Sequence, residues 1–164
     1  MRYKFCPECG SKLSEKPVGD EGLVPWCDKC DRPWFDTFNT CVLSVVVGED
    51  DEVLLIRQSY HDTAKYVGVA GYMKPNETAE IAAAREVAEE TGLSADSVTF
   101  LKSCFYEGRD QLMLGFVVRV HKNSLKLSGE VLEGKWFDID TAIKTVRQGS
   151  IVQQLLIYTK EKIL

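Results

Sequence analysis

Three glutamates, Glu86, Glu89 and Glu90, are spaced so that a single helix would present them together. At about 100° per residue they fall within one arc of roughly the same width. Carboxylates at this spacing repel one another, and the single Arg85 cannot neutralise all three. Hard divalent cations such as Mg²⁺ or Mn²⁺ bind carboxylate oxygens and would supply the missing charge. The alternative interpretation is a solvated acidic face of a helix.

Four cysteines form a second group with the spacing of a chemical site. Two pairs, each with two residues between its cysteines, are separated by 17 residues: Cys6 and Cys9, then Cys27 and Cys30. This spacing is typical of a tetrahedral zinc site, and four cysteine ligands leave no position for water, so the zinc would be structural. The alternatives are two disulfides or four unrelated thiols. Cys41 and Cys104 have no partner at metal spacing and are expected to be small buried apolar residues.

The acidic residues need a helix to hold them, and the sequence predicts one over residues 79–91. Asn76 or Thr78 can cap its start, and Gly92 can end it. On the side opposite the carboxylates, small apolar residues are expected to face the core: Ile81, Ala84, Val87, Ala88 and Thr91.

The other elements indicate a mixed α/β fold after a boundary near residue 36. Apolar runs at 42–47 and 53–56, joined by a charged turn, predict a hairpin. Further strands are expected at 98–106, 112–120 and 130–137, and helices at 140–148 and 151–163. The segment between the cysteine pairs has few large apolar residues, so a metal ion would replace its missing core.

Composition excludes several classes of protein. The chain has 164 residues, 45% of them hydrophobic, and a net charge of −5, which suits a folded protein and gives no general attraction to nucleic acid or membranes. No apolar stretch is long enough to span a bilayer, and the N-terminus lacks the apolar core of a signal peptide. We therefore expect a cytoplasmic protein without a membrane or nucleic-acid partner.

The stretch around the three glutamates resembles the Nudix box, the signature of the Nudix hydrolase family. It fits the pattern G-x5-E-x7-R-E-U-x-E-E-x-G-U, where U is aliphatic, at these positions: Gly71, Glu77, Arg85, Glu86, Val87, Glu89, Glu90, Gly92 and Leu93. The resemblance implies a Nudix fold over residues 37–164, an α/β (α+β) fold with a mixed sheet between helices. Residues 1–36 would form a zinc ribbon.

The resemblance also implies hydrolysis of a nucleoside diphosphate linked to another group. Glu86, Glu89 and Glu90 would hold catalytic Mg²⁺ or Mn²⁺, with Glu90 as our choice of general base and Arg85 supporting the site. A further acidic ligand is expected from the stretch EVLEGKWFDID. Glu133 is the first candidate and Glu130 the second, and surface charge is the alternative for both.

A four-cysteine ribbon before a Nudix domain resembles the NADH pyrophosphatase branch, as does the strand LMLGF at 112–116. Two motifs of that branch are altered. Its S-Q-P-W-P-F-P motif is absent, and its E-x-G-E reads Lys74-Pro75-Asn76-Glu77 here. For binding a nucleotide, aromatic rings could stack on the base and guanidinium groups could bind phosphate. Our candidates are Phe105, Tyr106, Arg57 and Arg109.

The substrate is therefore expected to be a small nucleotide, with NADH, NAD or ADP-ribose-like molecules as candidates. A second hypothesis is a non-catalytic nucleotide-sensing regulator that uses the ribbon to bind a partner. A third is hydrolysis of an NAD-like cap on RNA, which needs a basic groove that the sequence does not reveal. The branch resemblance alone implies a homodimer.

Overall fold

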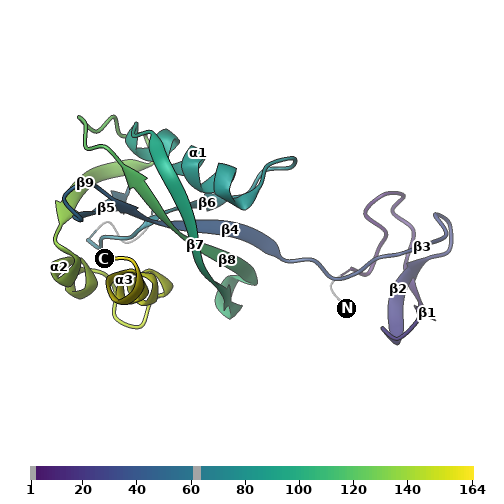
Figure 1. Ribbon diagram of the computed structural model, residues 1–164. Coiled ribbons are helices and arrows are strands. Elements are labelled where there is room, and N and C mark those ends of the chain that lie inside the picture. The colour runs from purple at the N-terminus through teal and green to yellow at the C-terminus, as the bar shows by residue number, and fades with distance from the viewer. Residues whose placement is uncertain (1–2, 61–63) are drawn as a thin grey trace. The chain divides into compact units, whose positions relative to one another are not determined.

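The computed structural model describes residues 3–60 and 64–164. The chain forms two compact units, Met1–Phe38 and Asn39–Leu164, which are coloured purple and blue-to-yellow in Figure 1. The division falls two residues after the expected boundary at 36. None of the described helices is long and apolar enough to cross a membrane.

The first unit is a three-stranded antiparallel sheet. Its strands are β1 (Ser14–Pro17), β2 (Leu23–Cys27) and β3 (Arg32–Pro33), with β2 in the centre. The small buried cluster of this unit consists of Cys6, Leu13 and Cys27, with Tyr3 and Trp34 among the residues packed against it. Two of its three members are cysteines, so this cluster contains a single large apolar side chain, Leu13.

The second unit contains a six-stranded mixed sheet. Five strands follow the order β7-β8-β4-β5-β9, and β6 pairs with β4 beside β5. The strands are β4 (Asn39–Val47), β5 (Val53–Gln58), β6 (Val69–Tyr72), β7 (Ala95–Tyr106), β8 (Gln111–Val120) and β9 (Val131–Phe137). The pairing of β4 with β8 is parallel, and the other pairings are antiparallel. The hairpin and the other expected strands are present; β6 is an additional strand.

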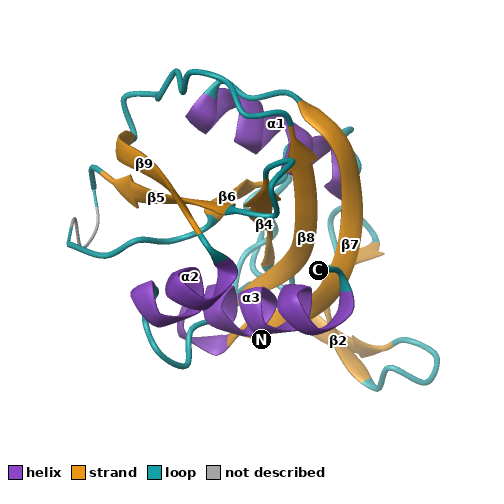
Figure 2. Ribbon diagram, turned by 60° about the vertical axis from the view of Figure 1, so that its left-hand side comes forward, coloured by secondary structure: helices purple, strands orange, loops and turns teal. Residues whose placement is uncertain are grey.

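Helices cover both faces of this sheet. In Figure 2, α1 (Ala79–Thr91) lies on one face, and α2 (Ile139–Thr145) and α3 (Ile151–Lys162) lie on the other. The central strand β4 contributes to a buried cluster on each face, since successive side chains of a strand point to opposite sides. Val42 and Val46 belong to one cluster, and Val45 and Val47 belong to the other. The mixed sheet between helices confirms the predicted fold class.

The ends of α1 are those predicted, but its buried face is only partly so. The Thr78 hydroxyl accepts a hydrogen bond from the backbone N–H of Ile81, and Gly92 ends the helix with a φ of 73°. Ile81 was expected inside and is 57% exposed. Ala88 is also exposed, whereas Val87 and Thr91 are buried as expected. The other buried positions are Ala82, Ala83 and Glu90. Alanines occur on several sides of this helix, so the apolar pattern alone could not orient it, and one carboxylate is turned toward the protein interior.

Candidate functional site

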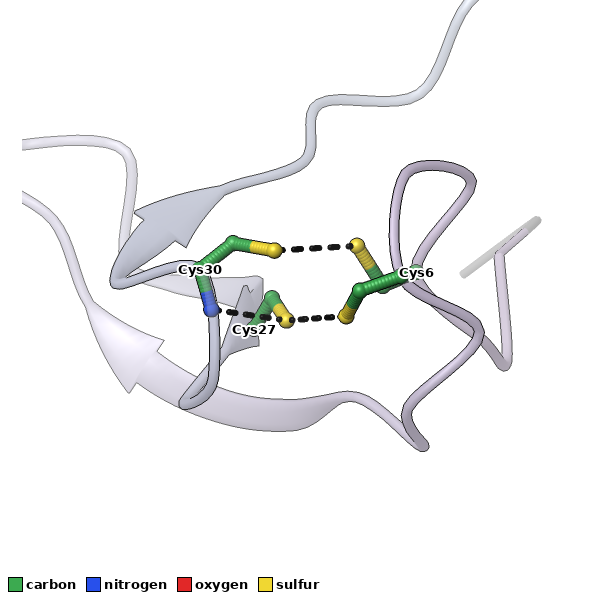
Figure 3. Close-up of side chains that lie close together, drawn as sticks. Cys6, Cys27 and Cys30 are labelled. Atoms are coloured by element: carbon green, nitrogen blue, oxygen red, sulfur yellow. Dashed lines mark hydrogen bonds between the residues drawn. The ribbon is translucent and has the colours of Figure 1, made fainter.

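The four cysteines of the first unit converge on one point. The Sγ atoms of Cys6 and Cys30 lie 3.9 Å apart, and those of Cys9 and Cys27 lie 3.5 Å apart. Figure 3 shows Cys27 and Cys30 facing Cys6 across this cluster. All four cysteines are free thiols, and a disulfide would bring its sulfurs to about 2.05 Å. The two-disulfide alternative is therefore wrong for this structure.

The sulfur arrangement fits a zinc ion. Tetrahedral zinc with Zn–S bonds of about 2.3 Å places its sulfur ligands about 3.8 Å apart, close to the observed separations. Each cysteine pair is followed by a residue in the left-handed region, Gly10 with a φ of 72° and Asp31 with a φ of 51°. These turns bring the thiols of each pair to the same side. The backbone N–H of Cys30 also donates to Cys27 Sγ at 3.3 Å, a contact that stabilises a thiolate.

The acidic residues of α1 line a cavity in the second unit. The cavity has a volume of about 920 Å³ and is walled by residues of α1, β4, β6 and β8 and of the loop before β9. Four glutamates face it: Glu86, Glu89, Glu90 and Glu130. Three cationic and three tyrosine side chains also line it: Lys74, Arg85, Arg109, Tyr60, Tyr72 and Tyr106. Its size is within the range of sites for small molecules and cofactors.

Arg85 organises the carboxylates of this wall. Its guanidinium donates to both oxygens of Glu77, at 2.7 and 2.9 Å, and to Tyr72 O at 3.1 Å. It also donates to Glu86 Oε1 at 2.6 Å and to Glu89 Oε2 at 3.0 Å. The hydrogen bonds from Arg85 are the main reason that the pKa of Glu77 is lowered to about 2. Arg85 thus ties the loop before α1 to the helix and orients two of the cavity glutamates.

The glycine at position 71 makes room for one of these carboxylates. A Cβ at Gly71 would lie 1.9 Å from Cδ of Glu86. Gly71 belongs to β6 and pairs with Val42 of β4, so its backbone cannot move away without disrupting the sheet. The side chain of Glu86 therefore lies directly against the strand, where any larger residue would displace it.

Glu90 is the most perturbed carboxylate of the cavity. It is only 5% exposed, and its Oε2 atom is buried with no hydrogen-bond partner among the described residues. Burial raises the pKa of Glu90 to about 8, with smaller contributions from the charges of Glu86, Glu130 and Glu89. A buried carboxylate that lacks a partner has a strong tendency to bind a proton or a cation.

Two observations indicate that the cavity glutamates could bind a hard divalent cation: the type of their ligand atoms and the buried Oε2 atom of Glu90. Mg²⁺ and Mn²⁺ prefer carboxylate oxygens, and Glu90 Oε2 has no hydrogen-bond partner in the part of the chain that the structure describes. Within the described residues, however, only the four cysteines have three or more ligand atoms gathered within 4.8 Å. The carboxylates already bind protein cations, Glu86 to Arg85 and Glu89 to both Arg85 and Lys74. A metal ion would have to draw the glutamates together.

Two candidates named from the sequence lie away from the cavity and bind each other. Glu133 forms an ion pair with Arg57 at 2.6 Å, and neither residue lines the cavity. The register of β5 and β9 places these two residues directly opposite one another, which explains the pairing. Glu130, the second choice, lies just before β9 and is in the cavity wall.

Of the two aromatic candidates on β7, only one faces the cavity. Tyr106 lines it and Phe105 does not, because neighbouring residues of a strand point to opposite faces. Arg109, in the 3₁₀ turn η1 (Glu107–Arg109), also lines the cavity.

Several cavity residues were not among the sequence candidates. Tyr72 and Gln111 meet in the wall, where Gln111 Nε2 lies 2.7 Å from the Tyr72 hydroxyl. Gln111 Nε2 also lies 3.5 Å from Sγ of Cys41, which is buried as expected. Lys74 pairs with Glu89 at 3.2 Å. The one feature of the sequence that could have pointed to Gln111 is its position, as a polar residue directly before the apolar strand LMLGF.

Comparison with known proteins identifies the second unit. A family model described as "NUDIX domain" matches residues 37–155. In fold, the chain is similar to a crystal structure of a NUDIX hydrolase from Nitrosomonas europaea, with a TM-score of 0.73 and 21% identity. That match covers 98% of this chain and 92% of the other.

Curated relatives match nearly the whole chain at modest identity. The "NAD-capped RNA hydrolase NudC" of Vibrio atlanticus is 27% identical over 161 residues, which cover 98% of this chain and 58% of the relative. The "NAD-capped RNA hydrolase NPY1" of Saccharomyces cerevisiae is 29% identical over 164 residues, covering 88% of this chain and 43% of the relative. The chain thus spans less than two thirds of the length of these relatives.

Proposed function

The chain belongs to the Nudix family, and we propose that it hydrolyses the pyrophosphate bond of a nucleoside diphosphate linked to another group. The substrates proposed are NADH, NAD or ADP-ribose-like molecules, in agreement with the names of the relatives. The products would be a nucleoside monophosphate and the phosphorylated remainder. The observation that carries this proposal is the buried oxygen of Glu90, which no described residue hydrogen-bonds, in a cavity lined by three further glutamates.

The residues of the cavity are proposed to have different roles in metal binding, proton transfer and substrate binding. Glu86, Glu89, Glu90 and Glu130 would hold Mg²⁺ or Mn²⁺. A bound ion would neutralise negative charge on the pyrophosphate and lower the pKa of a water molecule bound to it. Glu90 would accept the proton of the attacking water, since its carboxylate lies in the cavity wall beside the other glutamates. Arg85 would keep Glu86 and Glu89 oriented. Tyr106 and Arg109 would bind the base and a phosphate of the substrate.

The distal acidic role is assigned to Glu130 in place of Glu133. Glu130 faces the cavity and its charge raises the pKa of Glu90, whereas Glu133 is neutralised by Arg57. The two residues make a matched pair for mutation. Glu130→Gln should lower kcat by about 100-fold, and Glu133→Gln should change it by less than about threefold. Equal effects of the two substitutions would remove Glu130 from the site.

The reaction is tested with a hydrolysis panel in Mg²⁺ or Mn²⁺. The panel contains NADH, NAD⁺, ADP-ribose, FAD, diadenosine polyphosphates and nucleoside triphosphates, and product analysis identifies the bond that is cleaved. We expect turnover of at least one dinucleotide-type substrate and loss of most activity in Glu90→Gln. Nucleotide binding without turnover of any substrate would instead support the nucleotide-sensing regulator.

A second candidate substrate is RNA that carries NAD at its 5′ end, because both curated relatives are named as hydrolases of NAD-capped RNA. A short capped RNA compared with free NAD⁺ separates the two substrates. A kcat/KM at least about tenfold higher for the RNA would show that the protein also binds nucleotides beyond the cap.

The first unit is proposed to be a zinc ribbon, and the protein is proposed to form a homodimer. Cys6, Cys9, Cys27 and Cys30 would bind one zinc ion that holds the ribbon together. Homodimerisation is proposed from the branch resemblance alone, and light scattering on the purified protein tests it directly.

A further inference from the structure

A lysine ammonium lies among the carboxylates proposed to bind the metal. Lys74 Nζ is 3.2 Å from Glu89 Oε1, and Lys74 lines the cavity. The other oxygen of the same carboxylate, Glu89 Oε2, accepts from Arg85 at 3.0 Å. Both oxygens of Glu89 therefore accept a hydrogen bond from a protein cation, and a divalent ion that binds this carboxylate must compete with these two positive charges.

The two cations differ in how firmly they are held. Arg85 makes further hydrogen bonds to Glu77, Glu86 and Tyr72 O, and its side chain is only 18% exposed. The side chain of Lys74 is 58% exposed, and its pairing with Glu89 is its one ion pair in the described part of the chain. Releasing Lys74 breaks one exposed ion pair, whereas releasing Arg85 would disturb the network that orients the helix. Lys74 is thus the partner that a divalent ion would displace.

The backbone of Lys74 is fixed although its side chain is exposed. Its N–H donates to Glu77 Oε1, and Glu77 is held by two hydrogen bonds from Arg85. The ammonium can therefore move by rotation of the flexible four-carbon stem while its Cα stays at the cavity wall. After release from Glu89, this cation would lie in a cavity that must receive an anionic substrate, and a lysine ammonium binds phosphate as a point charge.

We propose that Lys74 is a mobile cation of this site, which holds Glu89 in the metal-free protein and binds a phosphate oxygen of the substrate once a divalent ion has displaced it. The inference rests on the proposed function. In this role Lys74 weakens the binding of metal before substrate arrives and strengthens the binding of phosphate afterwards.

The first test measures Mn²⁺ binding to the zinc-loaded full chain without nucleotide, by calorimetry and by the electron paramagnetic resonance signal of free Mn²⁺. Removing an exposed competing ion pair in Lys74→Met should tighten Mn²⁺ binding by about threefold. Lys74→Arg keeps the charge and should bind Mn²⁺ no more tightly than the wild type. In a Glu89→Gln background, Lys74→Met should have no further effect.

The second test measures hydrolysis of the best panel substrate at saturating Mg²⁺. Lys74→Met should raise KM by about tenfold, because a charged hydrogen bond to phosphate is lost, with kcat within about twofold of the wild type. The matched control is Lys160→Met, which removes another exposed lysine–carboxylate pair, to Asp140, away from the cavity. It should change neither measurement.

The outcomes separate this inference from the proposed function. A wild-type protein that binds no Mn²⁺ would refute both. Normal wild-type turnover combined with unchanged Mn²⁺ affinity in Lys74→Met would overturn displacement at Glu89. Tighter Mn²⁺ binding with an unchanged KM would overturn the phosphate contact, and in either of these two cases the mobile-cation inference fails while the hydrolase proposal stands.

Discussion

Glu90 should make the metal-free protein less stable as the pH rises from about 5 to 8. Its pKa is raised from the ordinary 4.5 to about 8 by burial and by the neighbouring glutamates. Below pH 4.5 the carboxyl is protonated in both the folded and the unfolded chain and imposes no penalty. At higher pH the unfolded chain releases the proton first, so ionisation favours unfolding until the folded carboxyl also ionises near pH 8.

The size of the effect follows from the two pKa values. Each pKa unit of difference corresponds to about 1.4 kcal/mol, so the buried carboxyl should cost the metal-free fold roughly 3–5 kcal/mol by pH 8. Glu90→Gln removes this ionisation and keeps the shape of the side chain. The variant should therefore gain stability relative to the wild type by about 1.4 kcal/mol per pH unit between pH 5 and 8.

The assay is urea unfolding of both proteins over this pH range, in buffers without Mg²⁺ or Mn²⁺ and with the zinc content checked. The matched control is Glu80→Gln, at an exposed position in the first turn of the same helix, which should show no comparable pH-dependent gain. Addition of Mg²⁺ at pH 8 should stabilise the wild type more than Glu90→Gln, since the ion neutralises the carboxylate. A stability difference between Glu90→Gln and the wild type that stays constant from pH 5 to 8 would refute the reasoning.

Three other substitutions, two of them with a matched control variant, test the remaining parts of the protein. Gly71→Ala forces a methyl group onto a glutamate of α1 and should cost about 1–3 kcal/mol of stability and most of the activity, whereas Gly129→Ala meets no atom within 4 Å and should be neutral in unfolding experiments. Elemental analysis should find about one zinc per chain, and Cys27→Ser should lose it. Arg109→Ala should raise KM about tenfold, and an equal rise in Arg57→Ala, which lies outside the cavity, would contradict the assignment.

The features predictable from sequence were those set by local physics. Thr78 and Gly92 marked the ends of α1 because capping geometry depends on neighbouring residues alone. The cysteine spacing likewise led to a cluster whose sulfur separations suit zinc. In both cases, residue type and short spacing carry the information.

The assignments that failed depended on how distant segments pair. Glu133 and Glu130 could not be ranked by spacing, since the choice depends on the register that places Glu133 opposite Arg57. Phe105 and Tyr106 lie on a strand that is exposed on both faces over much of its length, so no apolar alternation identified the side facing the cavity. The contact between Lys74 and Glu89 depends on how the loop before α1 folds back against the helix, which the sequence pattern does not reveal.

The parallel pairing of β4 with β8 has a consequence for how the chain folds during synthesis. Cys41 and Gln111 are in contact although 70 residues separate them in the chain, whereas 24 residues separate Cys6 and Cys30. Short-range contacts form early and long-range strand pairs form late. The ribbon can therefore close on the ribosome while β8 is still being translated. Until β8 emerges, β4 can pair with β5 and β6 on one side only, and its other edge remains open to pairing with another chain.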